Sequence, residues 1–235
     1  MNHIFVTGAN RGIGLEIVRQ LGERPKTTVY AACRRPDSAA ELQAVASRAH
    51  GTVHVIPLEV TDPAQIAAAK DHVRSHTNAL DVLINNAAID PDDDAQRFGR
   101  IDPDVMLHTL HINTVAPLLI AQAFVDLLEA SSLGRIVNIS SQMGSIAQRD
   151  YGGSYAYCAS KAALNMSTRG LAADLSRQGI VCVAIDPGWV KTDMGGRSAP
   201  LEREESARGL LRVIEHLTRT DNGAYKRWNG HDLPW

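Results

Sequence analysis

The chain has 235 residues, of which 44% are hydrophobic and 21% are charged, and its formal net charge is -2. This length and composition favour one domain with a substantial core, spanning residues 1–235. A nearly balanced charge, with no dense run of lysine or arginine, argues against nucleic acid or an anionic membrane as a partner. A small molecule is the expected ligand.

The beginning of the chain and its cysteines bear on its compartment. A strand-like run begins at His3, which leaves no room for a signal peptide, and no apolar run approaches the length of a membrane span. Cys33, Cys158 and Cys182 are odd in number and fall inside predicted strands or a helix. We therefore expect a cytoplasmic protein whose cysteines are small buried hydrophobes rather than disulfide partners or zinc ligands.

Short apolar runs alternate with helix-periodic segments along the whole chain. Strands are predicted at residues 4–7, 29–33, 53–57, 82–85, 136–140 and 181–185. Helices are predicted at residues 13–21, 38–50, 63–76, 103–130, 155–178 and 201–218. Continuous apolar strands separated by helices indicate a parallel sheet that is covered on both faces. The predicted fold class is α/β, a single-domain Rossmann-type, doubly wound parallel sheet with helices on both faces.

A glycine-rich turn follows the first predicted strand, where residues 7–14 read Thr-Gly-Ala-Asn-Arg-Gly-Ile-Gly. Glycines at a strand-to-helix junction permit a tight turn and let the backbone approach a pyrophosphate, which free amides at the helix N-terminus bind. The alternative is a loop whose glycines serve packing alone. The candidate cofactor-binding residues here are Gly8, Asn10, Arg11, Gly12, Ile13 and Gly14.

The end of the second predicted strand discriminates between nicotinamide cofactors, because an acidic residue there binds the adenosine ribose and repels a 2'-phosphate. Here the chain has Cys33, Arg34 and Arg35. Two guanidinium groups, joined by Arg11, offer positive charge and bidentate donors to a phosphate. We therefore expect NADP(H) rather than NAD(H). For any one of these arginines, the alternative is a side chain that only faces solvent.

Two irregularities border the predicted helix at residues 103–130. Residues 90–94, Asp-Pro-Asp-Asp-Asp, precede it and are expected to form a solvated surface loop, with a metal site as the alternative. Inside the helix, Pro117 cannot donate a backbone hydrogen bond to Asn113, so a kink is predicted there. Asn113 is thus placed at a distortion of the helix.

The pair Tyr157 and Lys161 carries the strongest chemical signal. Residues four apart on a helix lie one turn apart on the same face, so the Lys161 ammonium is expected within a few ångströms of the Tyr157 oxygen. A phenol has a pKa of roughly 10, and a neighbouring cation favours the phenolate and lowers that pKa. The pair therefore indicates a general acid or base, the alternative being a chance pairing on a solvated helix face.

Together these motifs resemble the short-chain dehydrogenase/reductase family over nearly the whole chain. They stand in the family's order: the glycine-rich turn, Asn85-Asn86-Ala87-Ala88, Asn113, Ser140-Ser141, Tyr157 with Lys161, and Pro-Gly-Trp-Val-Lys-Thr at residues 187–192. Residues 187–196 and the ending at 228–235 are most similar to the C-factor and sniffer-type carbonyl reductase branch.

The resemblance implies a catalytic set. Tyr157 would protonate the substrate oxygen, and Lys161 would lower the pKa of that phenol and bind the nicotinamide ribose. Ser141 would hydrogen-bond the carbonyl oxygen. We prefer it to Ser140 because alternation along a strand points the two hydroxyls in opposite directions. Asn113 would hold a water in a proton relay to Lys161.

The resemblance also implies cofactor contacts further along the chain. Asn86 and Ala87 would line the adenosine side of the groove, and Glu59 with Val60 would contact adenine. The segment expected to hold the nicotinamide contains Pro187, Gly188, Val190 and Thr192. Residues 195–200, which begin with two glycines, are expected to form a mobile segment over the ligand.

Three departures from the family pattern are visible. Glu59 stands where the family usually has aspartate, and Ala88 replaces a common glycine. The span between Ser141 and the catalytic tyrosine is longer than in many members and contains Tyr151 and Tyr155, so a different loop is expected beside the substrate site.

The histidines carry no predicted site. We expect none of the nine to form the paired spacing of a metal site, and His108 and His111 to be solvated or interfacial. No metal is expected.

The predicted function is an NADPH-dependent oxidoreductase that reduces an aldehyde, ketone or quinone to an alcohol by hydride transfer. The alternatives are a cofactor-binding signalling or regulatory protein of C-factor type and an enzyme similar to 3-oxoacyl-carrier-protein reductases. The resemblance further implies a homodimer or homotetramer packed through the helices at 103–130 and 155–178.

Overall fold

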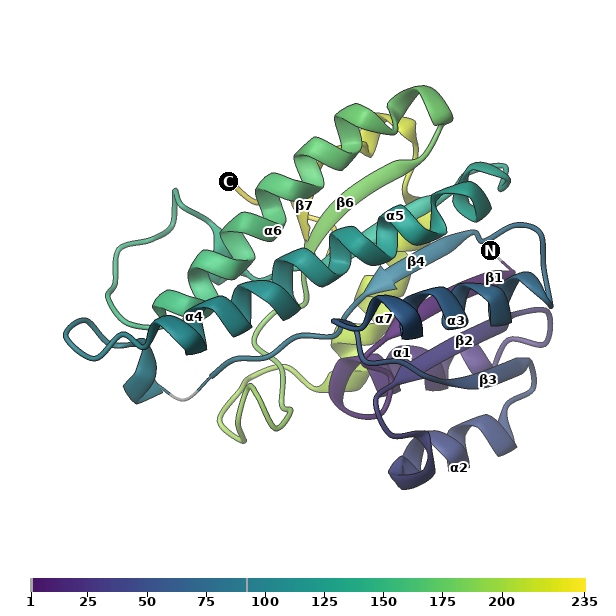
Figure 1. The fold of residues 1–235 in the computed structure, drawn as a ribbon, viewed down its shortest axis with the longest axis horizontal. Coiled ribbons are helices and arrows are strands. Elements are labelled where there is room, and N and C mark those ends of the chain that lie inside the picture. Colours follow the sequence, from purple (N-terminus) through teal and green to yellow (C-terminus); the bar gives the residue numbers. More distant parts are fainter. Residues whose placement is uncertain (1, 92) are drawn as a thin grey trace.

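Seven parallel strands form one sheet in the order β3-β2-β1-β4-β5-β6-β7 (Figure 1). We obtained this arrangement as a computed structural model that describes residues 2–91 and 93–235, except for the side chain of Asp93. The strands are β1 His3–Thr7, β2 Thr28–Cys33, β3 Thr52–Pro57, β4 Val82–Asn85, β5 Arg135–Ile139, β6 Val181–Asp186 and β7 Tyr225–Arg227. The strand order reverses between β1 and β4, which is where ligands bind in sheets of this topology.

The predicted doubly wound α/β fold is confirmed, and the six predicted strands are all present. The seventh strand, β7, was not predicted. It has three residues, Tyr-Lys-Arg, of which only Tyr225 is buried, so it lacks the apolar run by which the other strands are recognised. Its place is decided by pairing with β6, where Ala184 lies opposite Tyr225.

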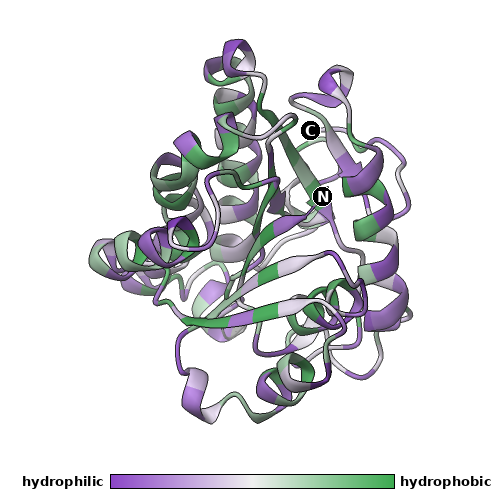
Figure 2. Cartoon of the chain, turned by 90° about the vertical axis from the view of Figure 1, so that its right-hand side faces the viewer, coloured by the Kyte–Doolittle hydropathy of each residue, from purple (hydrophilic) through white to green (hydrophobic). Residues whose placement is uncertain are grey.

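Helices cover both faces of the sheet, because both faces of its apolar strands must be removed from water. One core cluster joins the sheet to α1 Gly12–Gly22, α2 Ala40–Arg48 and α7 Arg203–His216. The other joins it to α3 Pro63–Arg74, α5 Ala116–Glu129 and α6 Tyr155–Asp174. Figure 2 shows the hydrophobic residues along the strands and hydrophilic residues on the outer turns of the helices.

An aspartate followed by proline begins two helices on the second face. Asp62 Oδ1 accepts hydrogen bonds from the amides of Ala64 and Gln65 at the start of α3, at 2.9 and 3.2 Å. Asp102 Oδ1 accepts in the same way at the start of α4 Pro103–Leu110. The carboxylates satisfy amides that have no helical partner, and the prolines occupy the first turn, where no N–H is needed.

The predicted distortion near Asn113 is confirmed as a π-helical turn, His111–Val115, between α4 and α5. Pro117 has no N–H, so the ordinary helical partner of the Asn113 carbonyl is missing and the turn widens. Asn113 is buried there, with 1% of its surface exposed. Figure 1 shows α4 and α5 as one continuous rod beside α6.

This rod corrects one expectation. The helical stretch Pro103–Glu129 has a window of mean hydropathy 1.4 and, by length and composition only, could cross a membrane. Half of that window is buried inside the protein, against the sheet and α6. A helix that covers a sheet face in a folded core has the same composition, so this property is weak evidence for a membrane span.

Candidate active site

A groove of about 470 Å³ runs along the carboxyl ends of the strands. The glycine-rich turn forms one part of its wall, and Tyr157 and Lys161 form another. Of the residues proposed from the sequence, the groove is lined by Gly8, Asn10, Arg11, Gly12, Ile13, Arg34, Arg35, Glu59, Val60, Asn86, Ala87, Tyr157, Lys161, Pro187 and Thr192. Most of the proposed cofactor contacts are therefore brought to one surface.

The glycine-rich turn needs its glycines for backbone conformation and for close approach. Gly8 and Gly12 have φ of +64° and +56°, in the left-handed region that favours glycine. Gly14 does not line the groove. A Cβ on it would lie 2.3 Å from the Gly8 carbonyl oxygen, so this position brings α1 against the turn itself. Asn86 closes the arrangement, because its Nδ2 donates to the carbonyls of Thr7 and Gly8 at 2.9 and 3.1 Å.

The end of the groove beside β2 and β3 is exposed and positively charged. Arg34 Nη1 lies 3.9 Å from a Glu59 carboxylate oxygen, and Arg11 Nη1 lies 3.1 Å from Asp193 Oδ2. The Arg34 and Arg11 side chains are 65% and 62% exposed, so these ion pairs are weak and the guanidinium groups can turn toward a bound phosphate. Ser38, which the sequence analysis did not select, also lines this end.

At the other end, Tyr157 and Lys161 lie one turn apart on α6 and are both buried, with 8% and 2% of their surfaces exposed. Lys161 Nζ donates to the carbonyl of Ile139 at the end of β5, at 2.8 Å, and lies 5.7 Å from the centre of the Tyr157 ring. Burial lowers the pKa of Lys161 to about 8. The ammonium is therefore held beside the tyrosine by a backbone acceptor.

The protonation of Tyr157 differs from the expectation. Burial and the negative charge of Asp90 raise the pKa of the Tyr157 phenol, and a hydrogen bond with Ser141 opposes this increase only in part. We expected Lys161 to lower the pKa of the phenol. Removal of the phenol from water has the larger effect and raises that pKa. A raised pKa keeps the phenol protonated at neutral pH, which is the state that a proton donor requires.

The two adjacent serines point in different directions, as alternation on a strand predicts. Ser140 Oγ donates to Asn165 Oδ1 at 2.6 Å and is buried in that contact. Ser141 Oγ accepts from the Met143 amide at 3.2 Å and lies near enough to the Tyr157 phenol to lower its pKa. Ser141 is not among the residues that line the groove, whereas Ser140 is. The hydroxyl that affects the pKa of the phenol is nevertheless that of Ser141.

The Asn113 side chain forms hydrogen bonds with Ile89 and Ser160. Its Oδ1 accepts from the Ile89 amide at 2.9 Å, and its Nδ2 donates to the Ile89 carbonyl at 2.8 Å and to Ser160 Oγ at 3.0 Å. The side chain thus fixes the π-helical turn to the segment after β4 and to α6. The water relay proposed for Asn113 remains a prediction. Because the side chain is engaged by Ile89 and Ser160, the water would have to bind the backbone carbonyl of Asn113.

In the segment after β6, some residues line the groove and others pack beneath them. Pro187 and Thr192 line the groove, together with Asp193 and Met194, which the sequence analysis did not select. Gly188 does not line it; φ is +82° there, and a Cβ would lie 3.0 Å from both Leu201 and Trp228. Val190 is likewise buried and forms a bridge with Leu201. The expected mobility of residues 195–200 remains a prediction.

A buried glutamine near Tyr157 carried no signal in the sequence. Gln96 is fully buried; its Oε1 accepts from the Tyr157 amide at 3.0 Å, and its Nε2 donates to Asp90 Oδ1 at 3.2 Å. It joins Asp90 to the first turn of α6. The alternative of a metal site in the acidic segment falls partly on Asp92, which lies outside the described residues.

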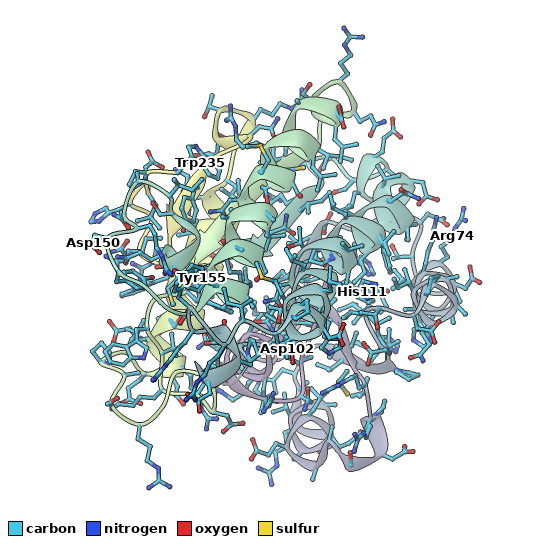
Figure 3. The ribbon with its side chains drawn as sticks, turned by 60° about the vertical axis from the view of Figure 1, so that its left-hand side comes forward. Arg74, Asp102, His111, Asp150, Tyr155 and Trp235 are labelled. Atoms are coloured by element: carbon cyan, nitrogen blue, oxygen red, sulfur yellow. The ribbon has the colours of Figure 1, made fainter. Side chains whose placement is uncertain are left out.

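The longer loop before α6 is bordered by the two extra tyrosines. The Arg149 guanidinium lies 4.1 Å from the centre of the Tyr151 ring and 6.0 Å from that of Tyr155. Figure 3 shows Tyr155 at the beginning of α6, with Asp150 and Trp235 on the same side of the molecule. These aromatic groups lie near the first turn of α6, which carries Tyr157.

The expectation for the histidines was wrong in one respect. His72 and His76 are four residues apart, which is a paired spacing, and together with His54 they bring three ligand atoms within 4.8 Å of one another. The spacing of His72 and His76 was visible in the sequence. The contribution of His54 was not, because His54 lies on a strand distant in the chain. All three cysteines are buried and free, as expected.

The parallel sheet, the glycine-rich groove at its carboxyl edge and the Tyr157–Lys161 pair define a Rossmann-type dinucleotide-binding protein. A family model described as short chain dehydrogenase matches residues 2–202. The chain belongs to the short-chain dehydrogenase/reductase family and is an oxidoreductase, and the resemblance stated from its motifs is confirmed. Enzymes of this family use a nicotinamide cofactor.

Individual relatives agree with this assignment. C-signal of Myxococcus xanthus is 42% identical over 159 residues, which cover 68% of this chain and 95% of that protein. The NADPH-bound carbonyl reductase from chicken fatty liver is 41% identical, with a TM-score of 0.93 and coverage of 100% and 99% of the two chains. Carbonyl reductase Sniffer of D. melanogaster is 36% identical, with a TM-score of 0.95 over both complete chains.

Proposed function

We propose that the protein is an NADPH-dependent carbonyl reductase that converts an aldehyde, ketone or quinone to an alcohol. The observation that carries the proposal is the buried Tyr157 phenol, near the Ser141 hydroxyl and one helical turn from the Lys161 ammonium, in the wall of the groove. This is a proton donor beside a hydroxyl that can receive a carbonyl oxygen. The chicken and fly carbonyl reductases, similar over their full lengths, support it.

The residues of the groove fit an NADP cofactor. Arg34, Arg35 and Ser38 line the end beside β2, and β2 itself ends in Cys33 rather than a carboxylate. Their guanidinium and hydroxyl donors suit a 2'-phosphate. Lys161, buried with one backbone acceptor at 2.8 Å, would bind the nicotinamide ribose with its remaining donors. NADPH held there would supply the hydride for the carbonyl carbon.

The residues of the chain would do the rest of the chemistry. The Ser141 hydroxyl would hold the carbonyl oxygen and stabilise the negative charge that develops on it. The Tyr157 phenol would give its proton to that oxygen. Lys161, charged below pH 8, would stabilise the tyrosinate that remains. Burial of this end would exclude bulk water from the transfer.

The test is oxidation of NADPH and NADH by the purified protein with a panel of aldehydes, ketones and quinones, using Tyr157→Phe as the control. Turnover with NADPH that disappears in the variant supports the proposal. Tight NADPH binding without turnover of any member of the panel contradicts it and favours the second candidate.

That second candidate is a cofactor-binding signalling protein. The 42% identity to C-signal favours it, whereas the presence of Tyr157, Lys161 and Ser141 favours catalysis. A 3-oxoacyl-carrier-protein reductase would use the same catalytic residues, and a carrier-linked substrate in the panel distinguishes it.

We also propose that two or four copies assemble through the helices α4, α5 and α6. Leu107 on α4 and Met166 on α6 are large apolar side chains that are 65% and 73% exposed, and Val115 between α4 and α5 is 41% exposed. A second copy would remove them from water. Sedimentation of the protein and of Met166→Glu tests this, since the charged variant should dissociate the assembly.

A further inference from the structure

Three histidines meet on the second face of the sheet, away from the groove. His54 lies on the edge strand β3, and His72 and His76 lie on and just after the last turn of α3. One ligand atom of each lies within 4.8 Å of the other two. Figure 3 labels Arg74, between His72 and His76 in the chain, on the opposite side of the molecule from Tyr155. The cluster is therefore separate from the proposed catalytic end.

Hydrogen bonds determine which nitrogen of His76 is available. Ser75 Oγ donates to the His72 carbonyl at 2.7 Å, so its lone pairs face His76 Nδ1 at 3.0 Å. His76 Nδ1 also lies 2.9 Å from that carbonyl. Both neighbours of Nδ1 are acceptors, so Nδ1 carries the proton and Nε2 carries a lone pair. A backbone carbonyl that fixes the tautomer in this way is the usual support of a metal-binding histidine.

His72 provides a second nitrogen. Its Nε2 is buried and has no hydrogen-bond partner in the described part of the chain. A buried polar atom without a partner destabilises a folded protein, so such atoms call for an explanation. Its ring lies 4.7 Å from that of His76 and 5.4 Å from that of His54, measured between ring centres. A ligand between the rings would satisfy this nitrogen.

The ring of Tyr30 holds His54 in place. His54 lies directly opposite Tyr30 in the β2–β3 ladder, and the two rings stack at 5.4 Å with only 12° between their planes. Tyr30 is completely buried, and its hydroxyl lies 3.2 Å from His3 Nδ1. Burial and the neighbouring imidazoles lower the pKa of His54 and of His72. Neutral imidazole is the form that binds metals.

We propose that His54, His72 and His76 bind one divalent transition-metal ion, with Zn²⁺ as the occupant and water in the fourth position. Three imidazoles without a thiolate or carboxylate suit Zn²⁺ and exclude the oxygen-preferring Mg²⁺ and Ca²⁺. Nitrogens of a tetrahedral zinc site lie about 3.3 Å apart, since each Zn–N bond is about 2.05 Å. The observed limit of 4.8 Å requires shifts on the order of 1 Å, which the exposed His76 ring can supply by turning about its contact with the His72 carbonyl.

The ion would link the edge strand β3 to the end of α3. The nearby cations do not oppose it strongly, because Lys70 and Arg74 are both engaged by Asp126, at 2.9 and 3.7 Å. Binding to the folded chain alone stabilises that chain by mass action. Zinc should therefore raise the melting temperature without changing NADPH binding, whichever function the groove has.

The test uses tag-free, chelator-treated protein titrated with Zn²⁺ in competition with a chromophoric chelator. The variants are His72→Gln and His76→Gln, and the matched control is His216→Gln. His216 makes the same Nδ1 contact with a carbonyl four residues earlier, at 2.8 Å, and lies outside the three-histidine group. Because His76 is exposed, its variant reports on binding even if the His72 variant fails to fold.

We expect one Zn²⁺ per wild-type chain, at least tenfold weaker binding in both cluster variants, and unchanged binding in the control. Tetrahedral Co²⁺ absorption in the wild type should disappear in the same two variants. Equal Zn²⁺ binding by all four proteins, or none by the wild type, would overturn the proposal.

Discussion

The two ends of the groove differ in the solvent exposure of their charged and polar side chains. At the β2 and β3 end, charged side chains stand in water: Arg34 and Arg11 are about two-thirds exposed and pair with carboxylates at 3.9 and 3.1 Å. At the α6 end, Tyr157 and Lys161 are buried, and Lys161 donates to the Ile139 carbonyl. Charges in water interact weakly and are screened by salt, whereas buried groups interact strongly. The exposed end can thus select a cofactor, and the buried end can shift a pKa.

Tyr157→Phe should cause the largest effect. Loss of the phenolic proton donor is expected to reduce turnover by roughly 10²- to 10⁴-fold, the usual contribution of a general acid. The ring remains, so packing and NADPH affinity should change little. Steady-state kinetics together with fluorescence titration of NADPH measure both. A variant that keeps a tenth or more of wild-type turnover would exclude Tyr157 as the donor.

The adjacent serines offer a matched pair at the same end. Ser141→Ala should lower kcat by about 10²-fold, because it removes a donor to the developing oxyanion. Ser140→Ala instead breaks the 2.6 Å bond to Asn165 and should lower stability by about 1–3 kcal/mol with little change in kcat. Kinetics and urea unfolding of the two variants decide between them. If Ser140→Ala proves the slower enzyme, the roles are reversed.

The pH dependence of reduction should report Lys161. Its pKa is about 8, so the ammonium is present at pH 7 and is lost as the pH rises through 8. We expect kcat at saturating NADPH to fall about tenfold per pH unit above that value.

Unfolding does not explain such a loss. Between pH 8 and 10.5 the unfolded chain binds the Lys161 proton more tightly than the folded chain, so this group increases the stability of the folded protein as the pH rises. Melting curves across the same pH range provide the control. A kcat that stays level to pH 10 would contradict the role of the ammonium.

Arg35→Ala tests the exposed end and should cause the smallest effect. Loss of one charge-assisted contact to a 2'-phosphate is expected to raise the KM for NADPH by about tenfold, with kcat unchanged and the KM for NADH unaffected. The difference should shrink at high salt. Equal changes for both cofactors would show that Arg35 does not recognise the phosphate.

Much of the fold was accessible to sequence reasoning because its signals are local. Continuous apolar runs predict buried parallel strands, and Pro117 predicts a distortion wherever the helix lies. The strand β7 was missed because Tyr225–Arg227 is short and polar, and only its pairing with β6 defines it.

For the site, the sequence by itself determined the chemical groups: the glycines after β1, the arginines after β2, and Tyr157 with Lys161 at the spacing of one helical turn. Only the tertiary structure decided their environment. It turned the Asn113 side chain to Ile89 and Ser160, placed Gln96 on the Tyr157 amide, and brought His54 to His72 and His76. It also raised the pKa of Tyr157 where local spacing predicted a decrease. The physical reason is that burial and contacts between distant segments depend on how the layers pack, whereas the order of residues along a turn does not.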